Sequence, residues 1–234
     1  MPGSGCVKVE LAVFDMVGTT VQGGDQVPSS FREAFRSVGI ELSDDAISRI
    51  RGRSKREAIS RLLSEHLGAP AGNEEQVELV YRRFQKALRA AYRSGSWPIP
   101  GAEDVFRFLR FAQVQVVLTT GLDRGTAQLL FKSLGWDSLG LLGLVTGDDV
   151  SRGRPAPDLI LYAMSLAGLE DAHSVVVVGD TGSDLAAAAA AKVGWSVGVL
   201  SGAHSRRQLE AHPHSAILET VQALPEWLKE VGAL

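Results

Sequence analysis

VKVELAVFDMVGTT, residues 7–20, is the stretch that decides the fold. Val7 to Phe14 is rich in β-branched and apolar residues, and it ends at Asp15 before a Gly-Thr-Thr turn. A short apolar run bounded by turn residues predicts a buried β-strand. This strand would deliver a carboxylate at its carboxyl end.

Three later segments have the same form, an apolar run that ends in a polar turn. The runs are 114–118, 174–178 and 196–200, and the turns are Thr119-Thr120-Gly121, Gly179-Asp180 and Ser201-Gly202. Helical patterns occupy 102–111, 124–134, 158–167 and 184–192. This alternation predicts an α/β fold with a doubly wound, Rossmann-like parallel sheet. Ligands of such sheets bind outside the carboxyl ends of the strands, so we expect the polar turns to converge on one cleft.

One block breaks the alternation, because from Pro28 to Arg93 the apolar residues recur with helical spacing alone. Glycine and proline turns flank the block, Gly23-Gly24 before it and Pro98 to Gly101 after it. We therefore predict an α/β core, residues 1–22 and 98–234, and an inserted helical domain, residues 23–97, called the cap below. Linkers at its base would let the cap close over the cleft and exclude water.

The composition excludes several classes of protein. Of 234 residues, 45% are hydrophobic and 22% charged, which is typical of a globular protein. A formal net charge of -3 gives no reason to expect nucleic acid or an acidic membrane surface as a partner. We see neither a charged leader with an apolar core nor an apolar run that could span a bilayer, so we expect a cytoplasmic protein.

Asp15 is the first candidate for chemistry. A carboxylate at a strand end beside a glycine turn can attack phosphorus and form an aspartyl-phosphate. Aspartate at this place can equally cap the turn that follows. The segment alone leaves both readings open.

A second pair of carboxylates lies in Gly179-Asp180-Thr181-Gly182-Ser183-Asp184. Two carboxylates four residues apart at a strand-to-helix turn can share a hard cation, and Mg²⁺ prefers few carboxylates completed by water and phosphate oxygens. Asp184 can alternatively serve only the helix dipole from the first turn. Asp180 precedes the helix, which favours metal binding for it.

Two further segments offer groups for a phosphoryl oxygen. Thr120 and Gly121 provide a hydroxyl and a backbone N–H at a strand end. Arg154 is held between Gly153 and the prolines that follow, whereas an isolated arginine would usually be a surface charge. A cation held in this way can neutralise both a nucleophile and a transferring group.

In this order and spacing, the four segments resemble the haloacid dehalogenase superfamily. The resemblance implies that Asp15 is the nucleophile, that Mg²⁺ binds Asp15, the Val17 carbonyl and Asp180 with Asp184 in support, and that the cap is mobile. It also implies that Thr120 and Arg154 surround the phosphoryl group. Further phosphate-binding residues expected on this basis are Gly18, Thr19 and Gly121.

Val17 departs from the pattern of most phosphatases in this superfamily, which carry a second aspartate there as general acid and base. An apolar residue at this position resembles the phosphonatase-like (phosphonoacetaldehyde hydrolase-like) branch. In that branch the leaving group is a carbon, activated as an imine by a lysine of the cap. The Thr-Thr-Gly turn and the arginine before the first proline, Arg154, match the same branch.

Lys55 is the candidate for that amine, since Gly52-Arg53-Ser54-Lys55 resembles the Gly-x-x-Lys segment of the branch. Ser54 and Glu57 form a capping box, which predicts that Lys55 opens a helix, where the dipole lowers the pKa of an amine. A basic residue here can also simply steer substrate. The branch has Met, His and Tyr where this chain has Arg51, Ala58 and Leu122.

We therefore expect a Mg²⁺-dependent hydrolase that acts on a small phosphonate or phosphorylated metabolite. Arg51, Arg53 and Lys55 could together bind a second acidic group of that substrate. Two alternatives remain: a general phosphatase of the phosphoglycolate phosphatase type, and a catalytically weak homologue that binds a metabolite. The protein would be a monomer or homodimer without nucleic-acid or membrane partners. His204, His212 and His214 are expected to be solvent-exposed.

Overall fold

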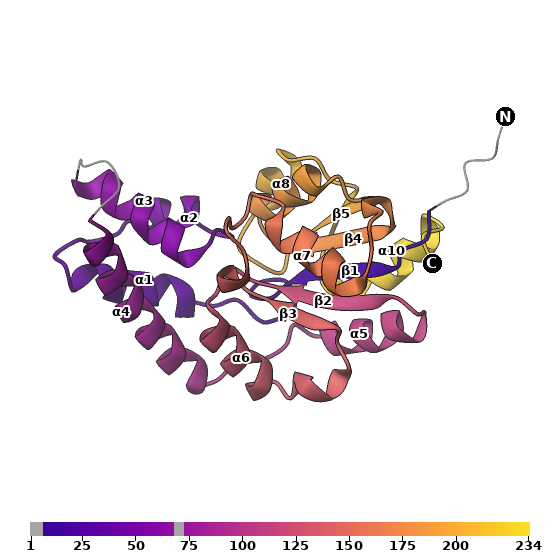
Figure 1. Cartoon of the computed structure of the whole chain (residues 1–234), viewed down its shortest axis with the longest axis horizontal. Coiled ribbons are helices and arrows are strands. Elements are labelled where there is room, and N and C mark those ends of the chain that lie inside the picture. The colour runs from indigo at the N-terminus through magenta and orange to yellow at the C-terminus, as the bar shows by residue number, and fades with distance from the viewer. Residues whose placement is uncertain (1–6, 68–72) are drawn as a thin grey trace.

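Six parallel strands form one sheet in the computed structural model, which describes residues 7–67 and 73–234 (Figure 1). The strands are β1 Leu11–Asp15, β2 Gln115–Thr119, β3 Gly143–Val145, β4 Val175–Gly179, β5 Trp195–Val199 and β6 Ala216–Leu218. Their order is β3-β2-β1-β4-β5-β6, and every neighbouring pair is parallel. The predicted α/β class and parallel sheet are confirmed.

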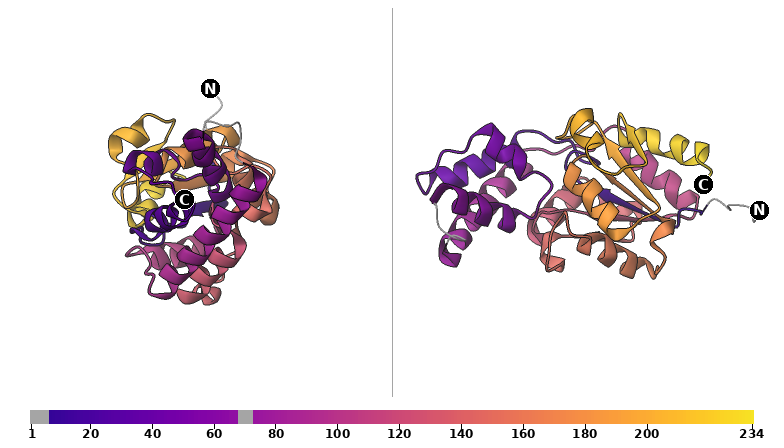
Figure 2. Two further views of the ribbon diagram at one scale, coloured as in Figure 1. Left: turned by 90° about the vertical axis from the view of Figure 1, so that its left-hand side faces the viewer. Right: turned by 90° about the horizontal axis from the view of Figure 1, so that it is seen from above.

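Four helices lie between β1 and β2 and form the helical block of the cap: α1 Gln26–Arg36, α2 Asp44–Arg49, α3 Lys55–Leu67 and α4 Glu74–Arg93. The core carries α5 Ala102–Phe111, α6 Arg124–Ser133, α7 Asp158–Ala167, α8 Gly182–Ala191, α9 Arg206–Glu210 and α10 Leu224–Glu230. Short 3₁₀ turns occupy Trp136–Leu139, Gly147–Asp149, Ala172–Ser174 and Val221–Ala223. Figures 1 and 2 show the four cap helices at one end of the molecule, beyond the carboxyl ends of the strands.

Both faces of the sheet are buried, which explains why its central strands are continuous apolar runs. Alternate residues of β1 point to opposite faces, so Ala12 and Phe14 pack in one apolar cluster and Leu11 and Val13 in another. The first cluster includes residues of α5, α10 and the cap, and the second includes residues of α7 and α8. Helices on both faces make the sheet doubly wound.

The strand order places a crevice between β1 and β4. From β1 the chain builds outward to β3 on one side, and from β4 it builds outward to β6 on the other. The adjacent loops therefore run to opposite sides, and ligands of open α/β sheets bind at such a switch point. Asp15 ends β1 and Asp180 directly follows β4, so both carboxylates lie there.

Two short linkers that pair with each other join the cap to the core. The amide of Gln22 donates to the Trp97 carbonyl over 2.9 Å, and the amide of Ile99 donates to the Thr20 carbonyl over 2.8 Å. Within the cap, α1 packs on α4 with ring centroids of Phe31 and Phe84 4.4 Å apart. The predicted limits of the cap at residues 23 and 97 stay a prediction.

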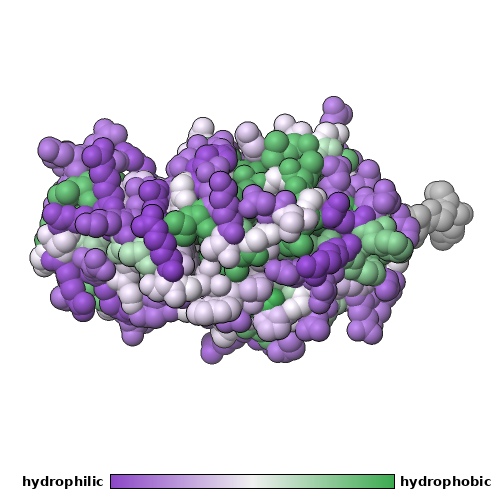
Figure 3. All heavy atoms as spheres, turned by 90° about the horizontal axis from the view of Figure 1, so that it is seen from below, coloured by the Kyte–Doolittle hydropathy of each residue, from purple (hydrophilic) through white to green (hydrophobic). Residues whose placement is uncertain are grey.

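The surface differs between the two parts of the chain. Figure 3 shows one face, on which the cap is mainly hydrophilic while apolar residues gather over the core. The cap uses its apolar residues inside, because those of α1, α3 and α4 belong to the large buried cluster. Among the residues described, no helix is long and apolar enough to cross a membrane.

The patterned elements were predicted most closely. The helices at 102–111 and 158–167 have the predicted bounds, whereas the first strand begins at Leu11 instead of Val7. Glu10 still bonds to the neighbouring segments, through its amide to the Ser174 carbonyl and through its carbonyl to the Gln115 amide, but the amide of Val9 donates to the Ala233 carbonyl. The strands β3 and β6 were not predicted, because three residues are too few to show a period.

Replacement of Phe106 by alanine should lower the free energy of unfolding by ~3–5 kcal/mol. Its ring is fully buried and contacts Phe14 and Trp136, each at a centroid distance of 5.5 Å. Chemical denaturation measures the loss. Phe111 on the same helix is the control: it is 88% exposed, and Phe111→Ala should change stability by less than ~0.5 kcal/mol. Equal losses for the two variants would contradict the packing described.

Candidate active site

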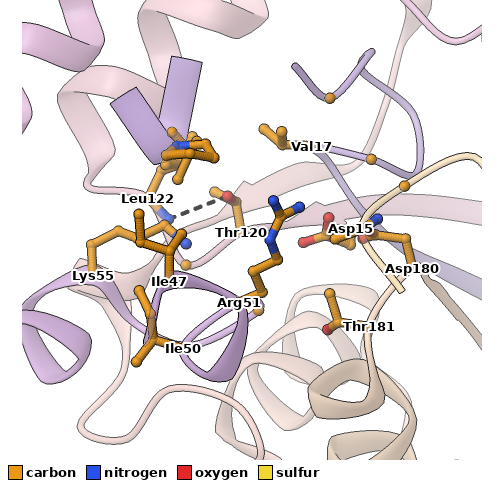
Figure 4. Close-up of a pocket in the computed structure, with 18 of the residues that line it drawn as sticks. Asp15, Val17, Ile47, Ile50, Arg51, Lys55, Thr120, Leu122, Asp180 and Thr181 are labelled. Atoms are coloured by element: carbon orange, nitrogen blue, oxygen red, sulfur yellow. Dashed lines mark hydrogen bonds between the residues drawn. The ribbon is translucent and has the colours of Figure 1, made fainter. Parts of the chain in front are cut away.

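A cavity of about 210 Å³ lies between the sheet edge and the cap (Figure 4). Eight of the predicted site residues line it: Asp15, Val17, Gly18, Arg51, Lys55, Thr120, Gly121 and Asp180. Four others do not line it: Thr19, Arg53, Arg154 and Asp184. The expected convergence of strand-end turns on one cleft therefore holds for β1, β2, β4 and β5, since Ser201 and Gly202 after β5 also line the cavity.

Arg154 holds the candidate nucleophile from outside the cavity. Its Nη1 donates to Asp15 Oδ1 over 2.6 Å and also to Oδ1 of Asp184. All three side chains are buried. The guanidinium thus balances the charge of Asp15 and fixes one of its oxygens. Its Nε and Nη2 are buried without a partner among the described residues.

Asp184 serves Arg154 and the start of α8. Its Oδ2 accepts the backbone amide of Thr181 over 3.0 Å and the hydroxyl of the same residue, which forms a capping box. Both carboxylate oxygens are therefore occupied by protein donors. The structure supports the helix-terminus reading of Asp184, with an added part in orienting Arg154, and places it outside the cavity where a metal would bind.

Asp180 lines the cavity, where two hydrogen bonds hold its carboxylate and Gly18 packs closely against it. Its Oδ2 accepts the amide of Ala203 over 2.7 Å, and its Oδ1 accepts the hydroxyl of Thr19 over 3.3 Å. Gly18 approaches so closely, with φ +100°, that a Cβ there would lie 2.4 Å from Asp180 Oδ2. Burial and the charge of Asp15 raise the pKa of Asp180.

The donors at this point fit Mg²⁺. Two carboxylates, Asp15 and Asp180, repel each other in a buried place, as the raised pKa of Asp180 shows, and a cation relieves that repulsion. The Val17 carbonyl accepts no hydrogen bond within residues 7–67 and 73–234 and offers a third oxygen. That part of the chain contains no group of three or more His, Cys, Asp or Glu side chains placed for a metal. Mg²⁺ typically binds a few protein oxygens, and water and substrate oxygens complete its coordination.

Thr120 and Gly121 form the turn after β2. The amide of Leu122 donates to Thr120 Oγ1 over 3.2 Å, which leaves the hydroxyl hydrogen for a ligand. The Gly121 carbonyl accepts the amide of Lys55 over 3.3 Å. A Cβ on Gly121 would lie 2.6 Å from the Arg53 carbonyl oxygen, so the cap rests directly on this turn.

Lys55 is the first residue of α3, as predicted. Its side chain is partly buried, and Nζ donates to the Arg53 carbonyl over 3.3 Å. Burial lowers the pKa of Lys55 to about 8, and the charge of Arg154 adds to this effect while that of Asp15 opposes it. Burial is thus the main cause of the lowered pKa, and a contribution of the helix dipole stays a prediction.

The structure separates the three cations that were expected to act together. Arg51 and Lys55 line the cavity, whereas Arg53 forms an ion pair with Glu57 at 3.4 Å and faces a second cavity. Arg53 therefore contributes its backbone carbonyl to the site and not its charge.

The turn after β5 contributes support that was not assigned from the sequence. Ser201 Oγ donates to the Gly18 carbonyl over 2.8 Å, and Ala203 binds Asp180 as described. Its signal was the Ser-Gly pair at a strand end. His204 corrects another expectation: its ring is partly buried, and its Nδ1 accepts the amide of Gly182 over 3.0 Å. His212 is also partly buried, and His214 is exposed as expected.

Comparison with known proteins decides the family. The model of the haloacid dehalogenase-like hydrolase family matches residues 9–192. The chain belongs to this family. The matched residues of this haloacid dehalogenase-like hydrolase include the strands β1 to β4 and the whole cap.

Individual relatives of this haloacid dehalogenase-like hydrolase indicate the branch. The phosphonoacetaldehyde hydrolase of Parabacteroides distasonis is 28% identical over 233 residues, which cover 95% of this chain and 88% of that protein. A hydrolase from Pseudomonas syringae superposes with a TM-score of 0.84 and 28% identity over 94% of this chain and 98% of that one. A phosphonoacetaldehyde hydrolase-like protein from Oleispira antarctica has a TM-score of 0.87 and 22% identity, covers 99% and 95% of the two chains, and shows the shared fold.

Mg²⁺ should raise the Tm of the protein through Asp180. A free Mg²⁺ concentration of about 100 times Kd adds ~2.7 kcal/mol to the free energy of unfolding. For a chain of this size that corresponds to a rise in Tm of roughly 5–10 °C. Thermal melts with and without Mg²⁺ measure it. Asp180→Asn should lose the rise because a charged ligand is removed.

Asp184→Asn is the matched control for that experiment. It should melt lower by itself, since it loses an oxygen that Arg154 or Thr181 uses, at a cost of ~1–3 kcal/mol. It should nevertheless keep the Mg²⁺-dependent rise. If Asp184→Asn also lost the Mg²⁺-dependent rise in Tm, Asp184 would be a metal ligand after all.

Proposed function

We propose that the chain is a Mg²⁺-dependent hydrolase that transfers the phosphoryl group of a small phosphonate or phosphate ester to Asp15. One observation carries the proposal: Asp15 faces the cavity beside Asp180 while Arg154 holds its other side. A carboxylate that is fixed, charge-balanced and open to a ligand on one side is suited to nucleophilic attack. The two carboxylates lie at the same switch point, where the bound ion would offset the charge of the phosphoryl oxygens.

The chemistry proposed has two steps. A carboxylate oxygen of Asp15 attacks phosphorus, the bond from phosphorus to the leaving group breaks, and its electron pair departs with that group. Water then attacks the phosphorus of the aspartyl-phosphate, which releases phosphate and restores Asp15. The Thr120 hydroxyl and the Gly121 backbone amide would bind the phosphoryl oxygens. The Gly18 amide, expected to do the same, already donates to the Val21 carbonyl over 2.8 Å.

Val17 cannot give a proton to the leaving group, and Lys55 is placed to assist it instead. With an aldehyde-bearing phosphonate, the Lys55 amine would condense with the carbonyl and release water. The electrons of the broken P–C bond then enter the enamine, which is protonated and hydrolysed to free the lysine. With a phosphate ester, the Lys55 ammonium would donate its proton to the leaving oxygen.

Similarity to proteins named phosphonoacetaldehyde hydrolase favours the phosphonate route. The general phosphatase is retained as the second candidate because a protonated Lys55 with a pKa of about 8 can serve it equally. A cytoplasmic location and a monomeric or homodimeric state stay predictions.

Asp15→Asn should abolish turnover, because the amide cannot form the covalent intermediate. We expect a loss of at least about 10⁴-fold in phosphate release from whichever substrate the wild type uses. Phosphate release from a set of phosphonates and phosphate monoesters, with and without Mg²⁺, measures it. Absence of Mg²⁺-dependent release from all of them, alongside binding of a ligand, would favour the weak metabolite-binding homologue.

The pH profile should distinguish the two roles of Lys55. Imine formation needs the neutral amine, so borohydride trapping with phosphonoacetaldehyde should rise as the pH increases through about 8 and leave a mass adduct on Lys55. Proton donation needs the ammonium, so phosphate-ester turnover should fall as the pH increases through about 8. Lys55→Arg should eliminate trapping. Turnover of phosphonoacetaldehyde without any trapped adduct would exclude the imine route.

A further inference from the structure

Arg51 presents to the cavity a cation whose electrostatic contact with a protein acid is weak. A hydrogen bond from Ser29 is the main cause of the lowered pKa of Asp25, the charge of Arg51 only adds to it, and Asp25 is exposed to water. The guanidinium of Arg51 makes no hydrogen bond or ion pair with any residue in 7–67 or 73–234, although the side chain is partly buried. The other arginines of that part of the chain without a partner, Arg93 and Arg207, are exposed to water. Withdrawal of a charge from water is unfavourable unless a counter-charge is met. Arg51 is therefore placed for an anionic ligand.

The place of Arg51 in the cap indicates which part of the ligand its side chain would meet. Figure 4 shows Arg51 extending into the cavity toward Thr120 and Asp15, and it comes from the cap, just after α2. The nucleophile and the leaving atom lie roughly in line across phosphorus in phosphoryl transfer. Asp15 attacks from the core, so the leaving group must point to the cap. Arg51 therefore enters the cavity from the side of the leaving fragment, and its reach toward Thr120 and Asp15 keeps the phosphoryl group as the alternative that the test below must exclude.

The remaining wall of the cap restricts the chemistry of that fragment. The described cap residues that line the cavity contribute polar side chains only at Arg51 and Lys55, and their other side chains are apolar: Val27, Pro28, Phe31, Ile47 and Ile50. This wall has donors but no acceptor side chain. A sugar, whose hydroxyls need acceptors as well as donors, would leave its hydroxyls unpaired here. A short carbon chain that ends in an anion would pack against the apolar side chains and offer the anion to the donors of this wall.

We propose that the leaving fragment of the substrate carries a carboxylate and that Arg51 binds it. The proposal rests on the function proposed above and names its substrate class: a small phosphonate or phosphate ester with a carboxylate on its carbon part. A guanidinium binds a carboxylate through two parallel hydrogen bonds, which fixes orientation as well as charge. The cavity of about 210 Å³ limits the fragment to a few atoms. Lys55 stays available for a carbonyl of a phosphonate or for the leaving oxygen of a phosphate ester.

A pair of isosteric ligands tests the proposal without any turnover. Phosphonoacetate and phosphonoacetamide share the phosphonate group and differ in the charge at the other end. In calorimetric titrations at pH 7 with Mg²⁺, the wild type should bind phosphonoacetate about tenfold or more tightly than the amide. Arg51→Gln should bring the two affinities within about twofold of each other, because it removes the contact that distinguishes them.

Arg49→Gln is the matched control, since Arg49 is exposed, pairs with Glu65 and does not line the cavity. It should keep the full preference for phosphonoacetate. Three results would overturn the proposal: a wild type that does not bind phosphonoacetate or does not prefer it, a preference that survives Arg51→Gln, or an equal loss of both ligands in Arg51→Gln. The last result would assign Arg51 to the phosphoryl group. These results can be told apart from a failure of the proposed function, which would appear as the absence of phosphate release in the substrate screen.

Discussion

Arg154 donates from one nitrogen, Nη1, to both Asp15 and Asp184. This buried contact balances the negative charge of the two carboxylates, and the other charged groups of the site are arranged around it. A buried carboxylate is unfavourable unless a counter-charge meets it, and Arg154 supplies that counter-charge to Asp15. Arg154 compensates Asp15 and Asp184, whereas the carboxylate of Asp180 accepts hydrogen bonds, within the described residues, from the Ala203 amide and the Thr19 hydroxyl. Burial and the charge of Asp15 raise the pKa of Asp180, and a bound cation would stabilise its charged form.

The cap reaches this charge cluster through backbone contacts that depend on glycine. A Cβ on Gly52 would lie 2.3 Å from Thr181 Oγ1, and one on Gly121 would lie 2.6 Å from the Arg53 carbonyl. The Ser183 hydroxyl also donates to the Arg51 carbonyl over 3.3 Å. The segment that carries Arg51 and Lys55 thus rests on the turns that carry Asp180 and Thr120. Small residues at the contact let side chains from both parts share one small cavity.

The sequence predicted what depends on local pattern and adjacency. Apolar runs that end in polar turns were enough to predict the sheet and to bring Asp15, Thr120 and Asp180 together. What it could not predict was the direction of a side chain once several partners compete for it. Asp184 turns toward Arg154 and Thr181, and Arg53 turns away to Glu57, although each lies within a few residues of a group that lines the cavity. Glu57 and Thr181 are partners within one helical turn, whereas Arg154 lies 30 residues before Asp184, so the outcome depends on how local and distant partners compete for one side chain.

The position of the cap and the protonation of Lys55 are linked by the same contacts. Burial is the largest cause of the lowered pKa of Lys55, and the cap resting on the Gly121 turn accounts for part of that burial. If the cap moved away, water would reach the amine and its pKa would return toward that of an ordinary lysine, about 10.4. The amine would then be almost fully charged and unreactive toward a carbonyl. The neutral amine that imine formation would need is therefore populated near neutral pH only while the cap rests on the core.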